Sequence, residues 1–210
     1  HYDSQKLLEQ LSKIMSTTIE LELLTARILE KVLMEVKITR GAFVLLKPKD
    51  GGTVDYVEPM GYGSEIPAFT KGNLDLFLQN TKVILFDDLE ESTLKQAMRD
   101  LGIFVVLPLT VLDQKIGILT LSDKSSGDIY SQQDLNVLEV LAPTLSVALQ
   151  NSREYEEIKR FNITLREEVD RATNDLQKKN TELIELDKLK NQYVALTSHE
   201  LRTPMSAIKG

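Results

Sequence analysis

Apolar residues recur every three or four positions in several long stretches of the chain, and shorter apolar runs lie between them. The first two stretches cover residues 3–15 and 21–38, and their spacing predicts an amphipathic helix over each. Ser16, Thr17 and Thr18 interrupt the pattern, so we expect them to provide the N-terminal cap of the second helix. A further helical pattern begins at Leu135 and continues almost to the C-terminus.

Short apolar runs bounded by Gly, Pro and Asp predict a sheet between these helices. The expected strands cover residues 42–47, 53–60, 83–86, 103–112 and 115–123, and short helices are expected over 73–79 and 93–101. Ser131, followed three residues later by Asp134, has the spacing of a capping box and predicts the start of the last helix. This order predicts an α+β fold in which helices flank a mainly antiparallel sheet and a long helix follows.

Within the last helix, the apolar pattern changes to a heptad-like stripe at Tyr155. Steps of three and four residues connect Tyr155, Ile158, Asn162, Leu165, Val169, Ala172, Leu176, Lys179, Leu183 and Leu186. The other faces are charged, and because so narrow a stripe requires a partner helix, we expect a parallel homodimeric coiled coil. Leu189 and Leu196 lie one position off this register, which predicts local over- or underwinding. The segment is interpreted as a signalling helix that transmits rotation or a register shift, or as a rigid spacer.

Composition narrows the class of protein. The chain has 210 residues, of which 42% are hydrophobic and 27% charged, enough for one domain and a helical extension. Its net charge of −7, without a basic cluster, argues against nucleic-acid binding. The absence of cysteine excludes disulfides, thiolate metal sites and a thioether-linked chromophore. No apolar run is long enough for a membrane span, and no metal site is expected.

One heptapeptide near the C-terminus, Ser198-His199-Glu200-Leu201-Arg202-Thr203-Pro204, carries candidate chemistry. A neutral imidazole is available as a nucleophile near pH 7, and the carboxylate of Glu200 can take up or orient its proton. Thr203 lies one helical turn after His199 and shares its face. Pro204 removes a backbone donor and weakens the helix just after the histidine. The alternative is an exposed histidine on a charged helix.

The surrounding string NQYVALTSHELRTPMSAIKG, residues 191–210, resembles the phosphoacceptor box of sensor histidine kinases. Tyr193 and Met205 stand where Phe and Leu are commoner in that family. The resemblance implies that His199 accepts the γ-phosphoryl group of ATP and that Glu200 assists as a general base. It also implies that Thr203 positions water when such a protein dephosphorylates its partner.

Residues 19–151 resemble the GAF domains of signalling proteins. The strings that carry the resemblance are Val106-Leu107-Pro108-Leu109, Ile116-Gly117-Ile118-Leu119 and Tyr130-Ser131-Gln132-Gln133-Asp134-Leu135. The family often binds a small molecule between the sheet and its short helices. Side chains of that region that could line such a pocket are Phe69, Leu74, Phe77, Phe86 and Met98. The alternative is that these five are core residues.

The sequence therefore predicts an N-terminal helix (1–18), a GAF-like sensor domain (19–151), a coiled-coil signalling helix (152–190) and the start of a phosphoacceptor domain (191–210). We expect this chain to be a cytoplasmic segment of a longer sensor histidine kinase, and a membrane anchor of that longer protein upstream of residue 1 is compatible with the sequence. That protein would use ATP and Mg²⁺ in a separate ATP-binding domain, without which this segment is inactive, and would pass phosphate to a response-regulator receiver domain. The alternative function is a GAF module that binds a small ligand of unknown identity, on a structural dimeric coiled coil.

Overall fold

The computed structural model describes residues 3–48, 52–64 and 66–208, with side chains described as far as residue 200. These residues fall into two compact units, His1–Glu157 and Ile158–Gly210. The expected hairpin turn at 48–52 lies mostly outside the described residues. The elements, in chain order, are α1 (Ser4–Thr17), α2 (Leu21–Val36), β1 (Gly41–Leu46), β2 (Val54–Met60), α3 (Lys71–Leu78), β3 (Ile84–Leu85), α4 (Thr93–Leu101), β4 (Val105–Val111), β5 (Gln114–Leu121) and α5 (Gln132–Ile208).

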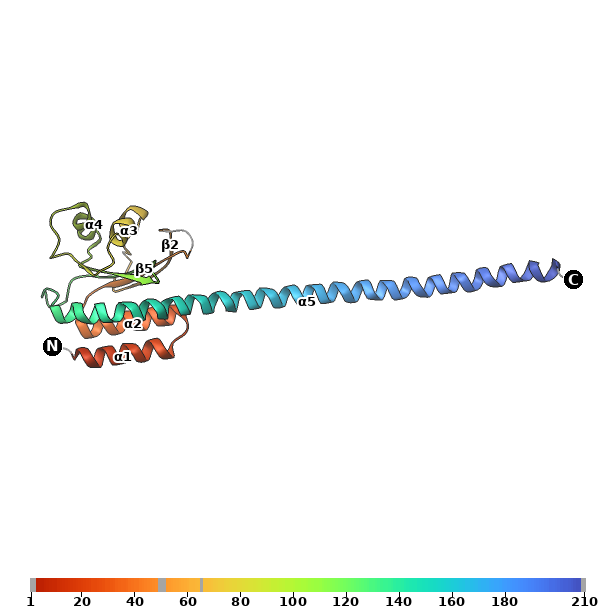
Figure 1. Cartoon of the computed structure of the whole chain (residues 1–210), viewed down its shortest axis with the longest axis horizontal. Coiled ribbons are helices and arrows are strands. Elements are labelled where there is room, and N and C mark those ends of the chain that lie inside the picture. Colours follow the sequence, from red (N-terminus) through yellow and green to blue (C-terminus); the bar gives the residue numbers. More distant parts are fainter. Residues whose placement is uncertain (1–2, 49–51, 65, 209–210) are drawn as a thin grey trace. The chain divides into compact units, whose positions relative to one another are not determined.

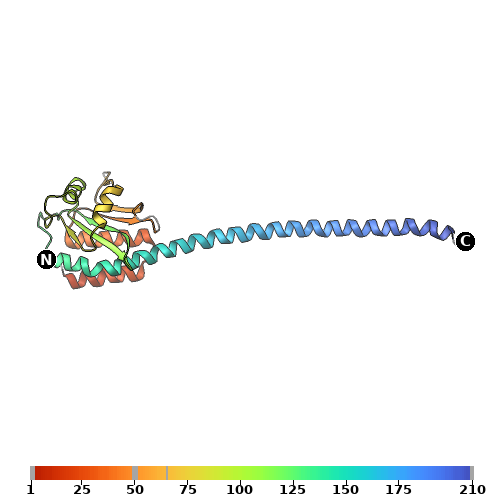
Figure 2. The same ribbon diagram turned by 45° about the horizontal axis from the view of Figure 1, so that its top comes forward.

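The first unit is built on a five-stranded sheet with the order β2-β1-β5-β4-β3, and all of its strand pairs are antiparallel. Helices α1 and α2 and the beginning of α5 lie on one face of this sheet, and α3 and α4 lie on the other (Figures 1 and 2). The predicted antiparallel sheet flanked by helices, followed by a long helix, is therefore confirmed.

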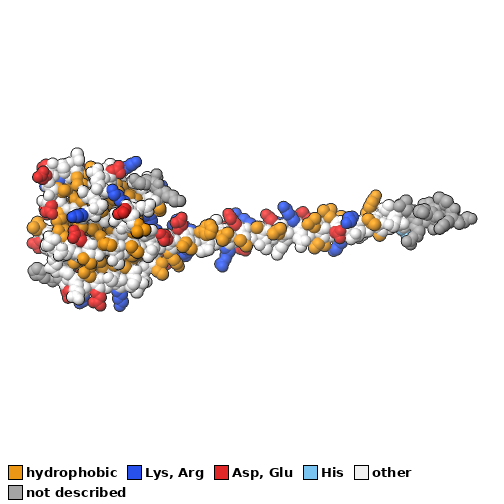
Figure 3. All heavy atoms as spheres, in the orientation of Figure 1, with side chains coloured by type: hydrophobic (Ala, Val, Ile, Leu, Met, Phe, Trp, Pro, Cys, Tyr) orange, Lys and Arg blue, Asp and Glu red, His pale blue; other side chains and the backbone are white. Residues whose placement is uncertain are grey.

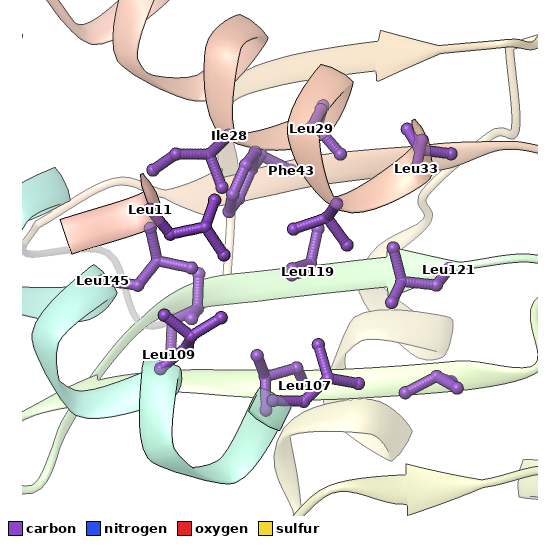
Figure 4. Packing of buried hydrophobic residues seen from close by; sticks show 14 of the residues in the cluster. Leu11, Ile28, Leu29, Leu33, Phe43, Leu107, Leu109, Leu119, Leu121 and Leu145 are labelled. Atoms are coloured by element: carbon purple, nitrogen blue, oxygen red, sulfur yellow. The ribbon is translucent and has the colours of Figure 1, made fainter. Parts of the chain in front are cut away.

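Side-chain alternation along the central strands produces two hydrophobic cores. Phe43 and Leu45 of β1 pack with α1, α2 and α5, whereas Val44 and Leu46 pack with α3 and α4. Successive side chains of a strand point to opposite faces, so one buried strand serves both cores. Figure 4 shows the first core, in which side chains of β1, β4 and β5 meet Leu11, Ile28 and Leu145 from the three helices.

The cap of α2 differs from the sequence prediction. The hydroxyls of Ser16 and Thr17 donate to the carbonyl oxygen of Lys13, at 3.0 and 2.7 Å, and so belong to the last turn of α1. The N-cap residue of α2 is Glu20, whose side chain makes no capping hydrogen bond. The predicted serine–threonine cap is therefore wrong, because these hydroxyls bond back within the preceding helix.

The start of α5 agrees with the sequence prediction. The backbone N–H of Ser131 donates to Oδ2 of Asp134 at 2.7 Å, and the N–H of Asp134 approaches the Ser131 hydroxyl oxygen at 3.3 Å. This reciprocal pair is the predicted capping box, and it satisfies donors that the first helical turn leaves without partners.

Candidate functional site

The N-terminus of α5 is fixed by a buried ion pair. Nζ of Lys124 lies 2.5 Å from Oδ2 of Asp134, and their side chains are only 12% and 3% exposed. Burial raises the pKa of the Asp134 carboxyl, but hydrogen bonds from Lys124 and Ser131 outweigh it and leave the pKa below its ordinary value. The hydroxyl of Tyr130 donates to the carbonyl oxygen of Ser122 beside this pair. An ion pair and a hydrogen bond to the end of β5 therefore hold the start of this helix.

The same helix is held a second time near the end of the first unit. Nη1 of Arg153 donates to the carbonyl oxygen of Leu46 at 2.7 Å, and its Nη2 donates to Oδ2 of Asp55 at 2.5 Å. One turn further on, Oε1 of Glu156 accepts the backbone N–H of Leu21 at 3.2 Å. The two side chains fasten α5 to the β1–β2 hairpin and to the first turn of α2.

Sequence reasoning did not identify Arg153 and Glu156. Their partners lie from 98 to 135 residues away in the chain, and neither residue belongs to a motif with fixed spacing. The only local signal is that the two residues flank Tyr155, the first heptad-like position, where an apolar pattern gives way to a charged one.

The second unit consists of the remainder of α5, and all of its described side chains are exposed. The heptad-like stripe lies among these exposed residues, with Leu165, Leu176 and Leu183 all solvent-accessible. Figure 3 shows hydrophobic side chains interspersed with Lys, Arg, Asp and Glu along this part of the chain. Within one chain, nothing in the described part of this unit covers the stripe.

The predicted phosphoacceptor residues all lie on α5. His199 and Glu200 are helical and exposed, and His199 makes an interaction with its surroundings. Thr203 is also within the helix, but its side chain lies outside the described ones. An exposed position on a helix leaves the imidazole of His199 accessible to another domain, which is the arrangement that transfer of a group in trans requires.

The five residues predicted to line a ligand pocket lie on the α3–α4 side of the sheet. Leu74, Phe77 and Met98 are fully buried in the second core, and Phe69 and Phe86 pack against it while partly exposed. Nζ of Lys95 lies 5.1 Å from the centre of the Phe86 ring. Their role in ligand binding stays a prediction, and in this structure they pack as core residues.

A surface cavity of about 680 Å³ lies elsewhere, at the end of the sheet from which α5 departs. Its walls come from the end of β1, the C-terminal half of α3, the β4–β5 hairpin and α5. The lining residues are Leu46, Lys47, Pro48, Asp75, Leu78, Asp113, Gln114, Lys115, Ile116, Gln150, Arg153, Glu154 and Glu157. None of the five predicted pocket residues contributes to it.

The described part of the chain lacks two kinds of structural feature. No group of three or more His, Cys, Asp or Glu residues there is arranged to hold a metal ion. No helix in that part is both long and apolar enough to cross a membrane.

Comparison with known proteins places this geometry in a family. The sequence model of the GAF domain family matches residues 18–150, which cover the sheet, the helices α2, α3 and α4 and the beginning of α5. The chain belongs to the GAF domain family. The resemblance seen in its strand and helix strings is thereby confirmed.

One characterised relative of this GAF domain chain is a kinase. Over 107 residues, 51% of the chain, it is 27% identical to the circadian input-output histidine kinase CikA of Thermosynechococcus vestitus. The chain spans only 15% of the length of that protein. The chain thus has a distant relationship to a histidine kinase.

Solved GAF domains share its fold. That of a phosphoenolpyruvate-protein phosphotransferase from Coxiella burnetii aligns with a TM-score of 0.54 and 11% identity, over 73% of this chain and 96% of the other. The phycoerythrobilin-bound GAF domain of a cyanobacterial phytochrome aligns with a TM-score of 0.54 and 15% identity, over 74% and 99%. At these identities the likeness establishes the fold alone.

Proposed function

We propose that this chain is the sensory and phosphoacceptor part of a two-component sensor histidine kinase. The observation that carries the proposal is the uninterrupted string Ser198-His199-Glu200-Leu201-Arg202-Thr203-Pro204, located on the helix that begins in the GAF domain. The distant relationship to a histidine kinase supports it.

In this proposal the Nε2 or Nδ1 lone pair of His199 attacks the γ-phosphorus of ATP, and ADP leaves. Glu200 holds or accepts the imidazole proton, so that the ring is neutral when it attacks. ATP and Mg²⁺ are bound by a separate ATP-binding domain. The phosphoryl group then passes from the imidazole to an aspartate of a response-regulator receiver domain. When the protein acts as a phosphatase, Thr203 positions the water that hydrolyses this aspartyl phosphate to aspartate and free phosphate.

The signal reaches His199 through α5 in a homodimer. The exposed stripe from Ile158 to Leu186 supports this step, because apolar side chains spaced every three and four residues are covered when two helices pair in parallel. The GAF domain and His199 then share one helix, and a rotation or register shift at its start changes the presentation of the imidazole. We place the working protein in the cytoplasm, where ATP and receiver domains are available.

Phosphotransfer in trans tests the proposal. The chain, extended through the second helix of the phosphoacceptor domain, is mixed with a histidine-kinase ATP-binding domain and γ-labelled ATP. We expect an acid-labile label on the extended chain that is absent from His199→Gln and retained by the neighbouring control Ser198→Ala. An unlabelled chain that is still dimeric, with an ATP-binding domain active on another substrate, would exclude the kinase role and favour a ligand-binding module.

Cysteine cross-linking tests the dimer, and the chain has no cysteine of its own. Leu183→Cys, on the stripe, should form a disulfide-linked dimer, whereas Thr181→Cys, on the opposite face, should not. Equal cross-linking at both positions would contradict the coiled coil. A single register under every condition, measured by cysteines along the whole stripe, would exclude transmission by a register shift.

A further inference from the structure

Helix α5 carries a line of apolar residues that begins inside the GAF domain. Its members alternate at spacings of seven and eleven residues in the sequence, and they are Val140, Val147, Ile158, Leu165, Leu176, Leu183 and Val194. Every one of these side chains is exposed, from 44% for Leu165 to 68% for Leu176. One spacing of each kind makes 18 residues, which is five turns of an α-helix at about 3.6 residues per turn. The line therefore stays on one face of α5.

The heptad-like stripe that starts at Tyr155 does not continue into the GAF domain in the same way. Seven residues turn an α-helix about 20° short of two full turns, so a heptad stripe moves slowly around a straight helix. At steps of seven residues before Tyr155 it reaches Ala148 and then Leu141, which is only 6% exposed and belongs to the first core. A partner helix cannot reach Leu141, whereas Val140 and Val147 are open to it.

Charged residues on the two sides of the apolar line have opposite signs. Acidic residues stand directly before members of the line, and basic residues stand directly after members of it. The acidic residues are Glu139, Glu157, Asp175 and Glu182, and the basic residues are Lys159 and Arg166. Because neighbouring residues are about 100° apart around a helix, the two sets form separate flanks. Among the described residues, none of these six forms an ion pair within its own chain.

This pattern of flanks is complementary to a second copy of itself in one orientation. When two identical helices pair in parallel about a two-fold axis, the acidic flank of one helix lies beside the basic flank of the other. In an antiparallel pair, flanks of the same sign would meet, and juxtaposed like charges repel. The charges beside the apolar line therefore select a second copy of this chain, in parallel orientation, as its partner.

We propose that a second copy of this chain packs along the whole apolar line, so that the dimer contact begins at Val140 and Val147 in the GAF domain. Spacings of seven and eleven residues average about 3.6 residues per turn, so the paired helices run with little supercoil, unlike a strict heptad repeat. His199 follows Val194 by five residues, about 140° around the helix, so its imidazole stays outside the contact. The proposal deepens the homodimer of the function proposed above and rests on it.

Cysteine cross-linking of the whole chain locates the start of the contact. Val140→Cys and Val147→Cys should form disulfide-linked dimers as Leu183→Cys does, because the contact brings the two copies of each residue within the Cα separation of roughly 4.4–6.8 Å that a disulfide needs. Glu139→Cys, at the exposed neighbouring residue, is the matched control and should not cross-link.

The outcomes separate this inference from the homodimer itself. Cross-linking of Leu183→Cys without cross-linking of Val140→Cys and Val147→Cys would overturn the inference and leave the homodimer intact. Failure of all three variants would overturn both. Cross-linking of Glu139→Cys as efficient as that of Val140→Cys would overturn the apolar line as the contact.

Sedimentation equilibrium measures what the GAF segment contributes to the dimer. Val147→Glu should raise the dimer dissociation constant at least about tenfold, because two carboxylates would face each other across the contact. Ile129→Glu replaces an exposed isoleucine outside α5 and should leave the constant unchanged. Both replaced side chains are exposed in the single chain, so the fold should persist, which circular dichroism checks. Equal dissociation constants in the two variants would overturn the proposal.

A charge exchange tests the parallel orientation. Arg166 lies on the basic flank, and Glu168 lies on the acidic flank, seven residues before Asp175. Arg166→Glu should weaken the dimer about two- to fivefold. Adding Glu168→Arg should restore the affinity, because residues two positions apart do not face each other within one helix and each meets the partner chain instead. Weakening without restoration would overturn the parallel arrangement.

Discussion

The carboxylate of Glu156 accepts a hydrogen bond from the backbone N–H of Leu21, 135 residues earlier in the chain, with 3.2 Å between Oε1 and the nitrogen. The first turn of a helix has N–H groups without intrahelical partners, and a local Ser, Thr, Asp or Asn usually accepts one of them. Here the acceptor comes from another helix. The cap of α2 is therefore also a tie between the GAF core and the segment of α5 that leaves it.

Glu156→Ala should destabilise the first unit by about 0.5–2 kcal/mol, the usual cost of losing an N-terminal cap. Glu156→Gln should cost less than Glu156→Ala, because the amide oxygen still accepts the hydrogen bond. Part of the stability should still be lost, because the amide brings no negative charge to the helix N-terminus. Urea unfolding followed by tyrosine fluorescence measures both. The matched control is Glu157→Ala, which removes the next carboxylate along α5 and should leave the midpoint unchanged. A similar loss in Glu157→Ala would attribute the effect to net charge instead of capping.

Arg153→Ala should destabilise the same unit by about 1–3 kcal/mol, since it removes charge-assisted hydrogen bonds from a largely buried side chain. Arg153→Lys should lose part of that stability, because an ammonium cannot reach the Leu46 carbonyl and the Asp55 carboxylate in one planar arrangement.

A double-mutant cycle between Arg153 and Asp55 separates the contributions of the two partners of Arg153. Asp55 is the more exposed partner, so its pairing should contribute only about 0.2–1 kcal/mol of the total. If the coupling free energy between Arg153 and Asp55 equalled the whole loss of stability in Arg153→Ala, the hydrogen bond to the Leu46 carbonyl would contribute nothing.

Stability should fall in acid as the Asp134 carboxylate is protonated. Its pKa in the folded chain is below the ordinary value of 3.8, so the unfolded chain binds more protons wherever the two states differ. The contribution of Asp134 is therefore complete above pH 3.8 and is lost as the pH falls through the folded pKa. Denaturant midpoints measured between neutral and strongly acidic pH should show this loss, and Asp134→Asn should flatten that part of the curve. An unchanged slope in the variant would assign acid lability to other carboxylates.

Gly117→Ala should be strongly destabilising, and Gly72→Ala should not. A Cβ at Gly117 would lie 2.3 Å from the carbonyl oxygen of Val44, between the paired strands β1 and β5. Such a clash forces the strands apart, with a cost of roughly 1–3 kcal/mol or more. At Gly72, in α3, the nearest atom to a new Cβ is 4.0 Å away, and alanine should stabilise the helix by about 0.5–1 kcal/mol. Thermal unfolding of the two variants side by side checks both signs.

Much of the fold follows from local patterns in the sequence. The strands are found where short apolar runs predict them, because β1, β4 and β5 are buried on both faces and need an apolar residue at nearly every position. Asp134 was identified as a capping residue because the capping box has a fixed spacing of three residues. The predicted cap at residues 16–18 failed because the same hydroxyls can bond forward or back, and only the packed structure decides which.

The candidate site was predictable only where its residues belong to one short sequence motif. His199, Glu200 and Thr203 form part of one string, and their proposed roles stay untested predictions. The cavity and the two ties of α5 depend on residues brought together from β1, α2, α3 and the β4–β5 hairpin. Lys47 and Lys115, for example, are neighbours only because β1 and β5 pair, and no spacing in the sequence reveals that.

The helix α5 belongs to both units, yet its two parts have different sources of stability. From Gln132 to Glu157 its backbone is secured by the core, whereas every described side chain from Ile158 onward is exposed within the chain. An unpacked helix is held mainly by its own hydrogen bonds and frays readily. Amide hydrogens of one continuous helix should therefore exchange with solvent on two timescales, with slow exchange before residue 158. Beyond residue 158, protection should rise with protein concentration. The fraction of this segment that is helical would then depend on the fraction of chains that are paired in the dimer.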